Sequence, residues 1–437
     1  MKKLFPIFFV LGFFSVSSAQ TWTTVGGGIS QGGSVKTLFV YDSTMYVGGF
    51  FSYPGNNIVQ WNGNNWKDLS SGVNAQVNTI GMYKDTIYIG GYFTRAGGHS
   101  AVSIVKWNGK LFHGLPFTTQ GGTIEALCAY DSLLFIGGTF DSVNHKHPSG
   151  LVTWNGKKTD SLHIAYGGYW GSLRILFRYK NDLLMGFGPL YASTYGQPLV
   201  AWDKKSLSYV GNNYFYTGSL NSFLYMNSFC LADTTLYLGG SFLYFENTYA
   251  SHPVKDTSNN IAMWNGKKWS VLGKGIHGMV NALTYFNGLL IAGGSFDSAG
   301  GEPAHNIAAW NGISWQPLGD GLNGTVNALA IFDSNLYAGG SFMGGIAELT
   351  KQQITQLPVS ATLYPNPNNG VFTIQLSSIN IPLSVQIYNV LGQKIYSATS
   401  SSQNIQVNLP IAKHGVYFYT ISAPGGRSIN SGKFIVE

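Results

Sequence analysis

Histidines and acids are the residues of this chain best suited to chemistry, and their spacing matches no catalytic or metal-binding pattern. The nine histidines are scattered along the sequence, and the pair in His145-Lys146-His147 has no carboxylate or cysteine arranged around it. A zinc or copper site needs three or four such ligands close together. We therefore expect no metal and no cofactor.

Most of the 18 acidic residues stand in turn sequences. In Asp42-Ser43, Asp131-Ser132 and Asp333-Ser334 the short polar side chains are expected to bond their own backbone. A glycosidase would need two acids placed about 5 to 10 Å apart, one of them with a pKa raised by burial. Asp297 and Glu302 suggest a weak calcium loop, but an Asx turn is favoured because calcium takes six or more oxygen ligands. The sequence therefore favours a protein that is not an enzyme.

Aromatic side chains are the better candidates for a binding site. They gather between residues 166 and 258, where the repeat described below is least regular. Insertions into repeats map to loops on one face, and aromatic rings there can stack on sugars or anchor protein partners. The alternative is that the rings refill the core of irregular repeats. The candidate binding residues are Tyr169, Trp170, Tyr191, Tyr195, Tyr244, Phe245 and Tyr249.

Composition and charge indicate short strands joined by tight turns. Of the 437 residues, 57 are glycine and 15% are aromatic, whereas only 10% are charged. Such a chain is expected to contain almost no helix. The formal net charge of +7 is spread along the sequence without a long basic run. We therefore expect no nucleic-acid partner.

Residues 1–19 have the layout of a secretory signal peptide. Two lysines precede an apolar stretch from Leu4 to Phe14, and Ser17-Ser18-Ala19 supplies the small residues of a cleavage site. The apolar stretch is shorter than the roughly 20 residues of a membrane span. In the exported chain, Cys128 and Cys230 align to different strand positions two repeats apart, so we expect two buried free thiols rather than a disulfide.

A repeated unit is the strongest signal in the sequence. In outline it reads V-N-A-L, a polar turn, L-Y-I-G-G-S-F, a loop, N-I-A-x-W-N-G and then W-x-x-L-G-x-G, with a period of about 46 residues. Seven copies are marked by a glycine doublet or its degraded form, at Gly48-Gly49, Gly90-Gly91, Gly137-Gly138, Gly186-Phe187-Gly188, Gly239-Gly240, Gly293-Gly294 and Gly339-Gly340.

Each unit predicts four strands that must pack against their neighbours. Alternating apolar residues predict strands, and the glycine doublet permits close approach of another backbone. The Asn-Gly after each tryptophan predicts a two-residue type I′ hairpin. The segment from Trp22 to Gly28 has the fourth-strand pattern, so we expect it to complete the seventh unit, with Ile354 to Leu357 as the alternative. A ring of seven blades would bury every sheet face.

The repeat resembles those of kelch-type propellers and of the central domain of galactose oxidase, although Trp-Asn-Gly replaces the kelch Tyr-Asp pair. The resemblance implies a seven-bladed β-propeller over residues 20–357. Propellers of this kind bind proteins or glycans or carry unrelated chemistries, so the resemblance says little about function.

The pattern changes after a linker at residues 358–362. Residues 363–437 predict a small immunoglobulin-like β-sandwich, which makes the whole chain all-β. Its motifs are similar to those of the type A C-terminal sorting domain of the type IX secretion system. The residues that carry this resemblance are Tyr364, Pro365, Asn366, Pro367, Gly370, Gly392, Gly415, Tyr417, Gly432 and Lys433.

The sorting-domain resemblance implies how the protein travels. It implies entry into the periplasm, passage across the outer membrane with the type IX secretion machinery as partner, and removal of the domain near Leu357 to Ala361. Release or attachment to a surface lipopolysaccharide would follow. We expect a secreted or surface-attached monomer that binds a glycan or a protein. The alternatives are a glycan-active hydrolase or lyase with acids in the propeller funnel, and a structural component of the surface or matrix.

Overall fold

The computed structural model describes residues 21–29, 32–143, 150–161, 173–188, 190–191, 197–217, 223–246, 255–349, 361–376, 383–400, 402–409, 413–422 and 428–437. The described residues form strands, turns and loops without any helix, so the fold is all-β as expected. It follows that they contain no helix able to span a membrane. The predicted signal peptide at residues 1–19 and the strand alternative from Ile354 to Leu357 lie outside the described residues.

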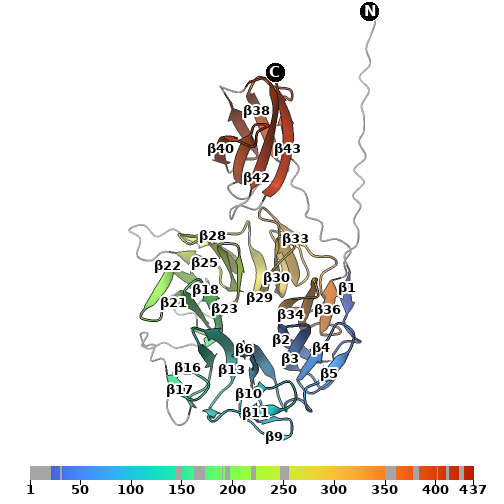
Figure 1. Ribbon diagram of the computed structural model, residues 1–437, viewed down its shortest axis with the longest axis vertical. Coiled ribbons are helices and arrows are strands. Elements are labelled where there is room, and N and C mark those ends of the chain that lie inside the picture. The colour runs from blue at the N-terminus through green and yellow to red at the C-terminus, as the bar shows by residue number, and fades with distance from the viewer. Residues whose placement is uncertain are drawn as a thin grey trace, which may run out of the picture.

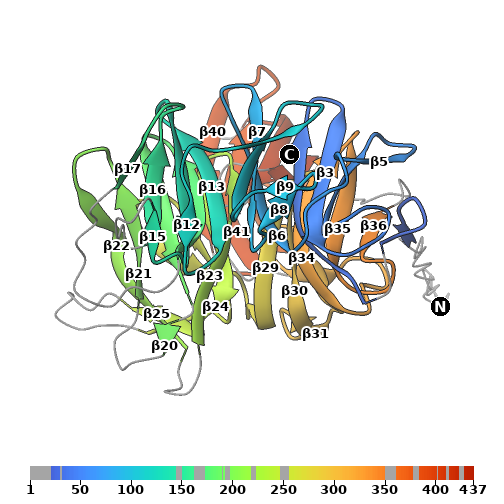
Figure 2. The same ribbon diagram turned by 90° about the horizontal axis from the view of Figure 1, so that it is seen from below.

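Seven sheets built on a common four-strand plan follow one another between residues 22 and 349 of the described chain. Figure 1 shows them around a central hollow, and Figure 2 shows the same arrangement from the side. We number the sheets 1 to 7 in the order of their innermost strands, which are β2 (Ser34–Tyr41), β6 (Val77–Tyr83), β13 (Ile124–Tyr130), β18 (Leu173–Tyr179), β23 (Phe223–Ala232), β29 (Ile276–Phe286) and β34 (Thr325–Phe332).

The other three strands of each sheet follow in order outward from the hollow. The second strands, each of which reaches the glycine doublet or its degraded form, are β3 (Thr44–Phe50), β7 (Thr86–Gly91), β14 (Leu133–Gly138), β19 (Asp182–Phe187), β24 (Thr235–Ser241), β30 (Leu289–Ala299) and β35 (Asn335–Ser341). The third strands are β4 (Ile58–Trp61), β10 (Ile104–Trp107), β16 (Leu151–Trp154), β21 (Gln197–Trp202), β27 (Ile261–Trp264), β32 (Ile307–Trp310) and β36 (Ile346–Leu349). The outermost strands are β5 (Trp66–Asp68), β11 (Phe112–Gly114), β17 (Thr159–Ser161), β22 (Leu207–Tyr216), β28 (Trp269–Val271), β33 (Trp315–Pro317) and β1 (Trp22–Thr24).

The N-terminal strand completes sheet 7, as the sequence predicted. β1 pairs antiparallel with β36, with Trp22 opposite Leu349. The indole of Trp22 also donates a hydrogen bond of 3.2 Å to the Leu318 carbonyl oxygen at the end of sheet 6. Residues from the two ends of the repeat region therefore share one sheet.

Both glycines of each doublet are required by close contacts, the first with the next sheet and the second within its own sheet. A Cβ added to Gly48, in sheet 1, would lie 2.6 Å from the side chain of Val77 in sheet 2, and a Cβ on Gly339 would lie 2.5 Å from Val35, back in sheet 1. The second glycine of a doublet is blocked by its own sheet instead, since a Cβ on Gly49 would lie 2.0 Å from the Ser34 carbonyl oxygen. Glycine is needed here because of the space and not because of a positive φ.

The hairpin after each tryptophan differs from the prediction. Trp61 pairs with Trp66, so the loop between them has four residues and not the two of a type I′ turn. The side-chain oxygen of Asn62 accepts hydrogen bonds from the backbone N–H groups of Asn64 and Asn65, at 2.9 and 2.8 Å, and Gly63 alone of the four has a positive φ. The asparagine thus closes the loop with its side chain, as Asx turns do. Asp203 plays the same part in sheet 4.

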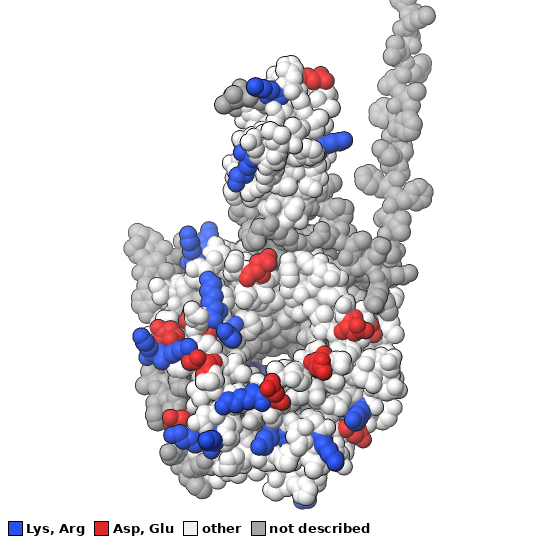
Figure 3. Space-filling view, in the orientation of Figure 1, with Lys and Arg blue, Asp and Glu red and all other residues white. Residues whose placement is uncertain are grey.

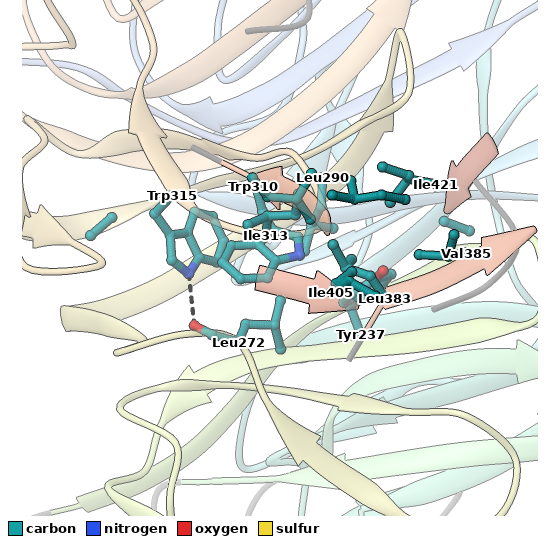
Figure 4. Packing of buried hydrophobic residues seen from close by; sticks show 14 of the residues in the cluster. Tyr237, Leu272, Leu290, Trp310, Ile313, Trp315, Leu383, Val385, Ile405 and Ile421 are labelled. Atoms are coloured by element: carbon teal, nitrogen blue, oxygen red, sulfur yellow. Dashed lines mark hydrogen bonds between the residues drawn. The ribbon is translucent and has the colours of Figure 1, made fainter. Parts of the chain in front are cut away.

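Tryptophans of the third and fourth strands hold adjacent sheets together. Trp315 is almost completely buried, and its indole N–H donates a 3.0 Å hydrogen bond to the carbonyl oxygen of Leu272 in sheet 5 (Figure 4). Ile313 in the same hairpin is also fully buried, whereas Lys267 at the matching place in sheet 5 is exposed. The buried cluster around Ile313 extends to the apolar interior of the C-terminal sheets.

The C-terminal region forms two facing sheets. One consists of β37 (Ala361–Tyr364), β38 (Val371–Leu376) and β41 (Asn404–Asn408), and the other of β40 (Lys394–Ser400), β39 (Leu383–Tyr388), β42 (Gly415–Ser422) and β43 (Ser428–Val436). Phe434 is fully buried between them, with its ring 4.5 Å from that of Phe372 and 5.6 Å from that of Tyr417. Two facing sheets agree with the predicted β-sandwich.

Both cysteines are free, as predicted. Cys230 is buried, but Cys128 is only partly buried, so the expectation of two fully buried thiols was wrong for Cys128. Burial raises the pKa of Cys128 to about 11 and that of Cys230 to about 12. Both thiols are therefore protonated and poorly nucleophilic at neutral pH.

Candidate functional site

One residue in each innermost strand is left out of the pairing with the second strand, as in a β-bulge. The shift falls at the same place in all seven sheets, opposite the glycine doublet and away from the hairpin turn that joins the two strands. We call the seven skipped residues the polar ring, because all have polar or charged side chains. They are Lys36, Asn78, Glu125, Arg174, Asn227, Asn281 and Asn327.

The asparagines of the polar ring tie neighbouring sheets together. The side-chain amide of Asn227 donates to the Val280 carbonyl oxygen at 3.1 Å, and that of Asn281 donates to the Val326 carbonyl oxygen at 3.1 Å. Asn327 continues the series into sheet 1 by donating to the Val35 carbonyl oxygen at 2.9 Å. In each case the acceptor immediately precedes the next ring residue, so asparagine is a structural choice at these positions.

Three ring positions carry charges instead of asparagine, namely Lys36, Glu125 and Arg174. Thr123 and Asn78 donate to a carboxylate oxygen of Glu125, each at 3.2 Å. The ion pairs of the described residues, Lys204–Asp131 and His277–Asp297, include none of the three. Among the described residues, therefore, no carboxylate forms an ion pair with either cation.

The three charges act on one another although they come from sheets 1, 3 and 4. Burial raises the pKa of Glu125, and the positive charges of Arg174 and Lys36 and the hydrogen bond from Thr123 oppose this rise. Burial also lowers the pKa of Lys36, with repulsion from Arg174 adding to the effect and Glu125 opposing it. The charged part of the polar ring is thus a partly desolvated site in which the three charges influence one another.

The raised pKa of Glu125 predicts a pH-dependent cost to stability. Because the folded protein holds this proton more tightly than the unfolded chain, the cost develops as pH rises from the ordinary glutamate pKa through the folded pKa. Glu125→Gln should therefore raise the free energy of unfolding relative to wild type at pH 8 and not at about pH 4. Urea unfolding of both proteins at the two pH values measures this difference.

Asp297→Asn provides a control of opposite sign. Hydrogen bonds from His277 and Ser298 lower the pKa of Asp297, so its contribution is stabilising above the ordinary aspartate pKa and is lost as pH falls. Asp297→Asn should therefore have a lower free energy of unfolding than wild type at pH 8. Equal effects of Glu125→Gln at pH 4 and pH 8 would contradict the raised pKa.

Aromatic side chains lie beside the charged part of the polar ring. The guanidinium carbon of Arg174 lies 5.3 Å from the ring centroid of Tyr225, within the range of a cation–π contact. The Tyr225 ring is in turn 6.3 Å from that of Phe223, which is 40% exposed. β20 (Leu190–Tyr191), which includes the candidate residue Tyr191, pairs with the end of β23, and Tyr191 lies opposite Phe223. An aromatic surface therefore starts at Arg174.

Two other candidate binding residues lie in an insertion of sheet 5 that pairs with sheet 4. The insertion forms β25 (Tyr244–Glu246) and β26 (Asp256–Thr257), and β25 continues the edge of β22. The ring of Tyr244 stacks on that of Tyr216 at 4.9 Å, and Lys255 Nζ lies 4.7 Å from its centroid. The insertion starts at the glycine-doublet end of β24, so it lies at the same end of the strands as the polar ring.

The predicted role of Phe245 was wrong. Its side chain is only 1% exposed and packs against Phe215 and Trp269, because the alternating residues of β25 place it toward the core while Tyr244 faces the other way. For this residue the core alternative holds. Tyr169, Trp170, Tyr195 and Tyr249 lie outside the described residues, and for Tyr191 only the backbone is described.

The remaining titratable groups do not form a second site in the described part of the chain. No three of its His, Cys, Asp and Glu residues come close enough together to hold a metal ion. His277 Nδ1 lies 2.9 Å from an Asp297 oxygen, and both side chains are largely exposed. The side-chain hydroxyl of Ser298 donates to the same carboxylate at 2.8 Å. Asp297 lies within β30, so its side chain does not form the expected turn. Figure 3 shows charges of both signs interspersed around the central hollow on the face in view.

The polar ring was missed by sequence reasoning, although the repeat contained its signal. The second position of V-N-A-L is asparagine in four units, and it is Lys36, Glu125 or Arg174 in the other three. Aligning the seven units at this position picks out the three charged residues. Recognising them as one site also requires knowing that the position is a bulge beside the central axis.

The first sorting motif, from Tyr364 to Gly370, joins the two ends of the C-terminal region. The side-chain oxygen of Asn366 accepts a 3.0 Å hydrogen bond from the Ile435 backbone N–H, and the Asn368 N–H donates to the Ile435 carbonyl oxygen at 3.0 Å. Gly370 has a φ of 92° and donates to the Asn368 side chain. The first motif thus fixes the last strand, to which Gly432 and Lys433 belong.

Solved structures resemble the chain in fold at low sequence identity, whereas no curated protein matches it. The extracellular domain of BT4673 from B. thetaiotaomicron is 14% identical with a TM-score of 0.50, over 82% of this chain and 45% of that one. A fungal alcohol oxidase of the AA5 family, in complex with copper, is 12% identical with a TM-score of 0.44, over 96% of this chain and 99% of that one. The computationally designed Ika8 protein is 13% identical with a TM-score of 0.42, over 74% and 98%. The first likeness supports the all-β fold alone.

A family model identifies the C-terminal region. Residues 362–437 match the secretion system C-terminal sorting domain, in agreement with the resemblance carried by Tyr364 to Gly370. Such a domain implies interaction with the type IX secretion machinery and marks a protein that is secreted or placed on the cell surface. Residues 362–437 of this chain are therefore a secretion system C-terminal sorting domain.

Proposed function

We propose that the protein is a seven-bladed β-propeller that is exported by the type IX secretion system and binds a glycan or a protein ligand outside the cell. The cyclic series of contacts supports the propeller, because Gly48 accommodates Val77 of the following sheet and Gly339 accommodates Val35 of the first. The pairing of β1 with β36 supports it further. Export would begin with the signal peptide and pass through the periplasm.

The observation that carries the binding function is the joining of aromatic and charged side chains at one end of the sheets. Phe223 and Tyr225 lead from the strand edge to Arg174 of the polar ring. Tyr244 and Tyr216 stack at the same end, where the sheet 5 insertion adds β25 beside β22 of sheet 4. Aromatic faces beside a few polar groups are typical of sites that bind sugars or protein side chains.

Binding is favoured over catalysis because the polar ring holds a single carboxylate. A glycosidase places two acids about 5 to 10 Å apart. Glu125 has the raised pKa of a general acid, but the other charged ring residues, Lys36 and Arg174, are cations. A glycan-active hydrolase or lyase remains the second candidate because of Glu125. A purely structural surface component is the third.

Ligand binding is tested on a glycan array and by calorimetry with the full chain. Phe223→Ala and Tyr244→Ala should each weaken binding by about tenfold, because a stacked aromatic contact contributes about 1 kcal/mol or more. Tyr92→Ala is the matched control, since Tyr92 is 67% exposed and follows the glycine doublet of another sheet. Its affinity should equal that of wild type.

The other outcomes separate the three candidate functions. Bound and uncleaved ligand supports the proposal, whereas release of shorter products that stops in Glu125→Gln supports the hydrolase or lyase. Absence of binding to any glycan or exposed protein favours the structural component.

A further inference from the structure

We propose that the charged side of the polar ring, with Phe223 and Tyr225, binds the carboxylate-bearing sugar of an acidic glycan. The inference rests on the proposed binding function and names its ligand class. Lys36 and Arg174 would hold the carboxylate, and the aromatic rings would pack against the face of the sugar. This pairing of a cation with an aromatic face suits an acidic sugar, which combines a carboxylate with an apolar face of ring C–H groups.

Two cations able to bind a carboxylate are present, and neither takes part in an ion pair within the described residues. Arg174 leans over Tyr225 and forms no ion pair within the described residues, and Lys36 likewise has no carboxylate within ion-pair distance. By contrast, the asparagines at the other ring positions donate hydrogen bonds from their side-chain amides to the neighbouring sheet, as Asn281 does to the Val326 carbonyl oxygen. Where Lys36 and Arg174 stand in place of asparagine, the ring position therefore supplies a positive charge instead of an amide bonded to the neighbouring sheet.

The net charge of the ring fits a monoanion better than a dianion. Two cations and one carboxylate give 2 − 1 = +1 for Lys36, Arg174 and Glu125 together, with the asparagines neutral. A carboxylate ligand would bring this total to zero. A dianionic phosphate would leave an excess negative charge in a partly desolvated site beside Glu125, which is unfavourable.

The position of the aromatic residues sets the orientation of the ligand. Tyr225 precedes the ring residue Asn227 on β23, and Phe223 lies farther toward the beginning of that strand, where its side chain is 40% exposed. A glycan whose acidic sugar sits at Arg174 would therefore extend outward over Phe223. Tyr191, opposite Phe223 on β20, lies along the same path.

The test uses the full chain and a set of oligosaccharides that contain galacturonate, glucuronate, mannuronate or guluronate, each beside its methyl ester. Esterification removes the charge and keeps the sugar rings. At least one acid should bind, and its ester should bind at least about tenfold more weakly, the loss expected for one charge-assisted hydrogen bond. Arg174→Gln and Lys36→Gln should each reduce affinity for the acid by a similar factor.

Three further variants make the result specific to this site. Glu125→Gln should tighten binding of the acid, since the ring charge rises from +1 to +2. Lys204→Gln, which removes a surface cation paired with Asp131, should leave affinity unchanged. Phe223→Ala should weaken binding of the acid and of its ester alike.

The inference is overturned if acids and esters bind equally, or if acid binding is indifferent to both Arg174→Gln and Lys36→Gln. In those cases a ligand is still bound and the proposed binding function stands. If no member of the set binds while neutral glycans or proteins do, the ligand class is wrong. If nothing binds at all, the proposed function itself fails.

Discussion

Removing residues 362–437 should abolish export of the protein and retain it inside the cell envelope. These residues are the sorting domain, and the apolar clusters of most of the other sheets do not include them, so the remaining chain keeps its core. The measurement is the fraction of an epitope-tagged protein found on the surface or in the medium compared with the envelope. A nearly complete shift to the envelope is expected.

Two companion variants separate loss of the signal from loss of stability. Phe434→Ala empties the fully buried centre of the sorting domain and should cost about 3 to 5 kcal/mol there, with export reduced accordingly. Fusing residues 361–437 to a soluble reporter that has its own signal peptide should make the reporter leave the cell. Normal surface levels of the truncated protein, together with a retained reporter, would falsify the assignment of export to this domain.

Gly294→Ala should destabilise the protein by about 3 kcal/mol, as expected when a methyl group is forced into a filled space. The added Cβ would lie 2.0 Å from the Met279 carbonyl oxygen, a backbone atom that cannot move away without breaking the strand pairing of sheet 6. Guanidinium unfolding followed by tryptophan fluorescence measures the change. Backbone amides on both sides of the bulge at Asn281 should exchange hydrogen faster in this variant than in wild type.

Gly114→Ala is the matched control for this substitution. Gly114 also ends a strand, but it is exposed, it has no positive φ, and an added Cβ would meet nothing within 4 Å. The expected change is within about 0.5 kcal/mol of zero. Equal effects of the two alanines would mean that the close approach at Gly294 does not limit stability.

Much of the fold follows from local patterns that can be read without coordinates. The repeat predicted four strands in each unit, and the resemblance of Trp22 to Gly28 to a fourth strand predicted the pairing of β1 with β36. These features succeed because strand alternation, turn residues and steric crowding are properties of a few consecutive residues.

Local patterns were less successful where a side chain competes with the backbone. The Asn-Gly pairs predicted two-residue hairpins, but the side chain of Asn62 accepts two backbone hydrogen bonds and opens the loop to four residues. Phe245 appeared in an aromatic-rich insertion suited to binding, yet strand pairing turns it into the core. The burial of Ile313 follows only from its packing in one apolar cluster with the C-terminal sheets.

The sequence by itself determined an all-β repeat protein with a C-terminal sorting domain, because repeats and motifs are written in residue order. Only the tertiary structure decided that the charges of Lys36, Glu125 and Arg174 interact, since each residue lies in a different sheet, at the bulge of its innermost strand. Their mutual pKa effects require proximity. The pKa of a charged group depends on its neighbours in space, and here those neighbours are far apart in the sequence.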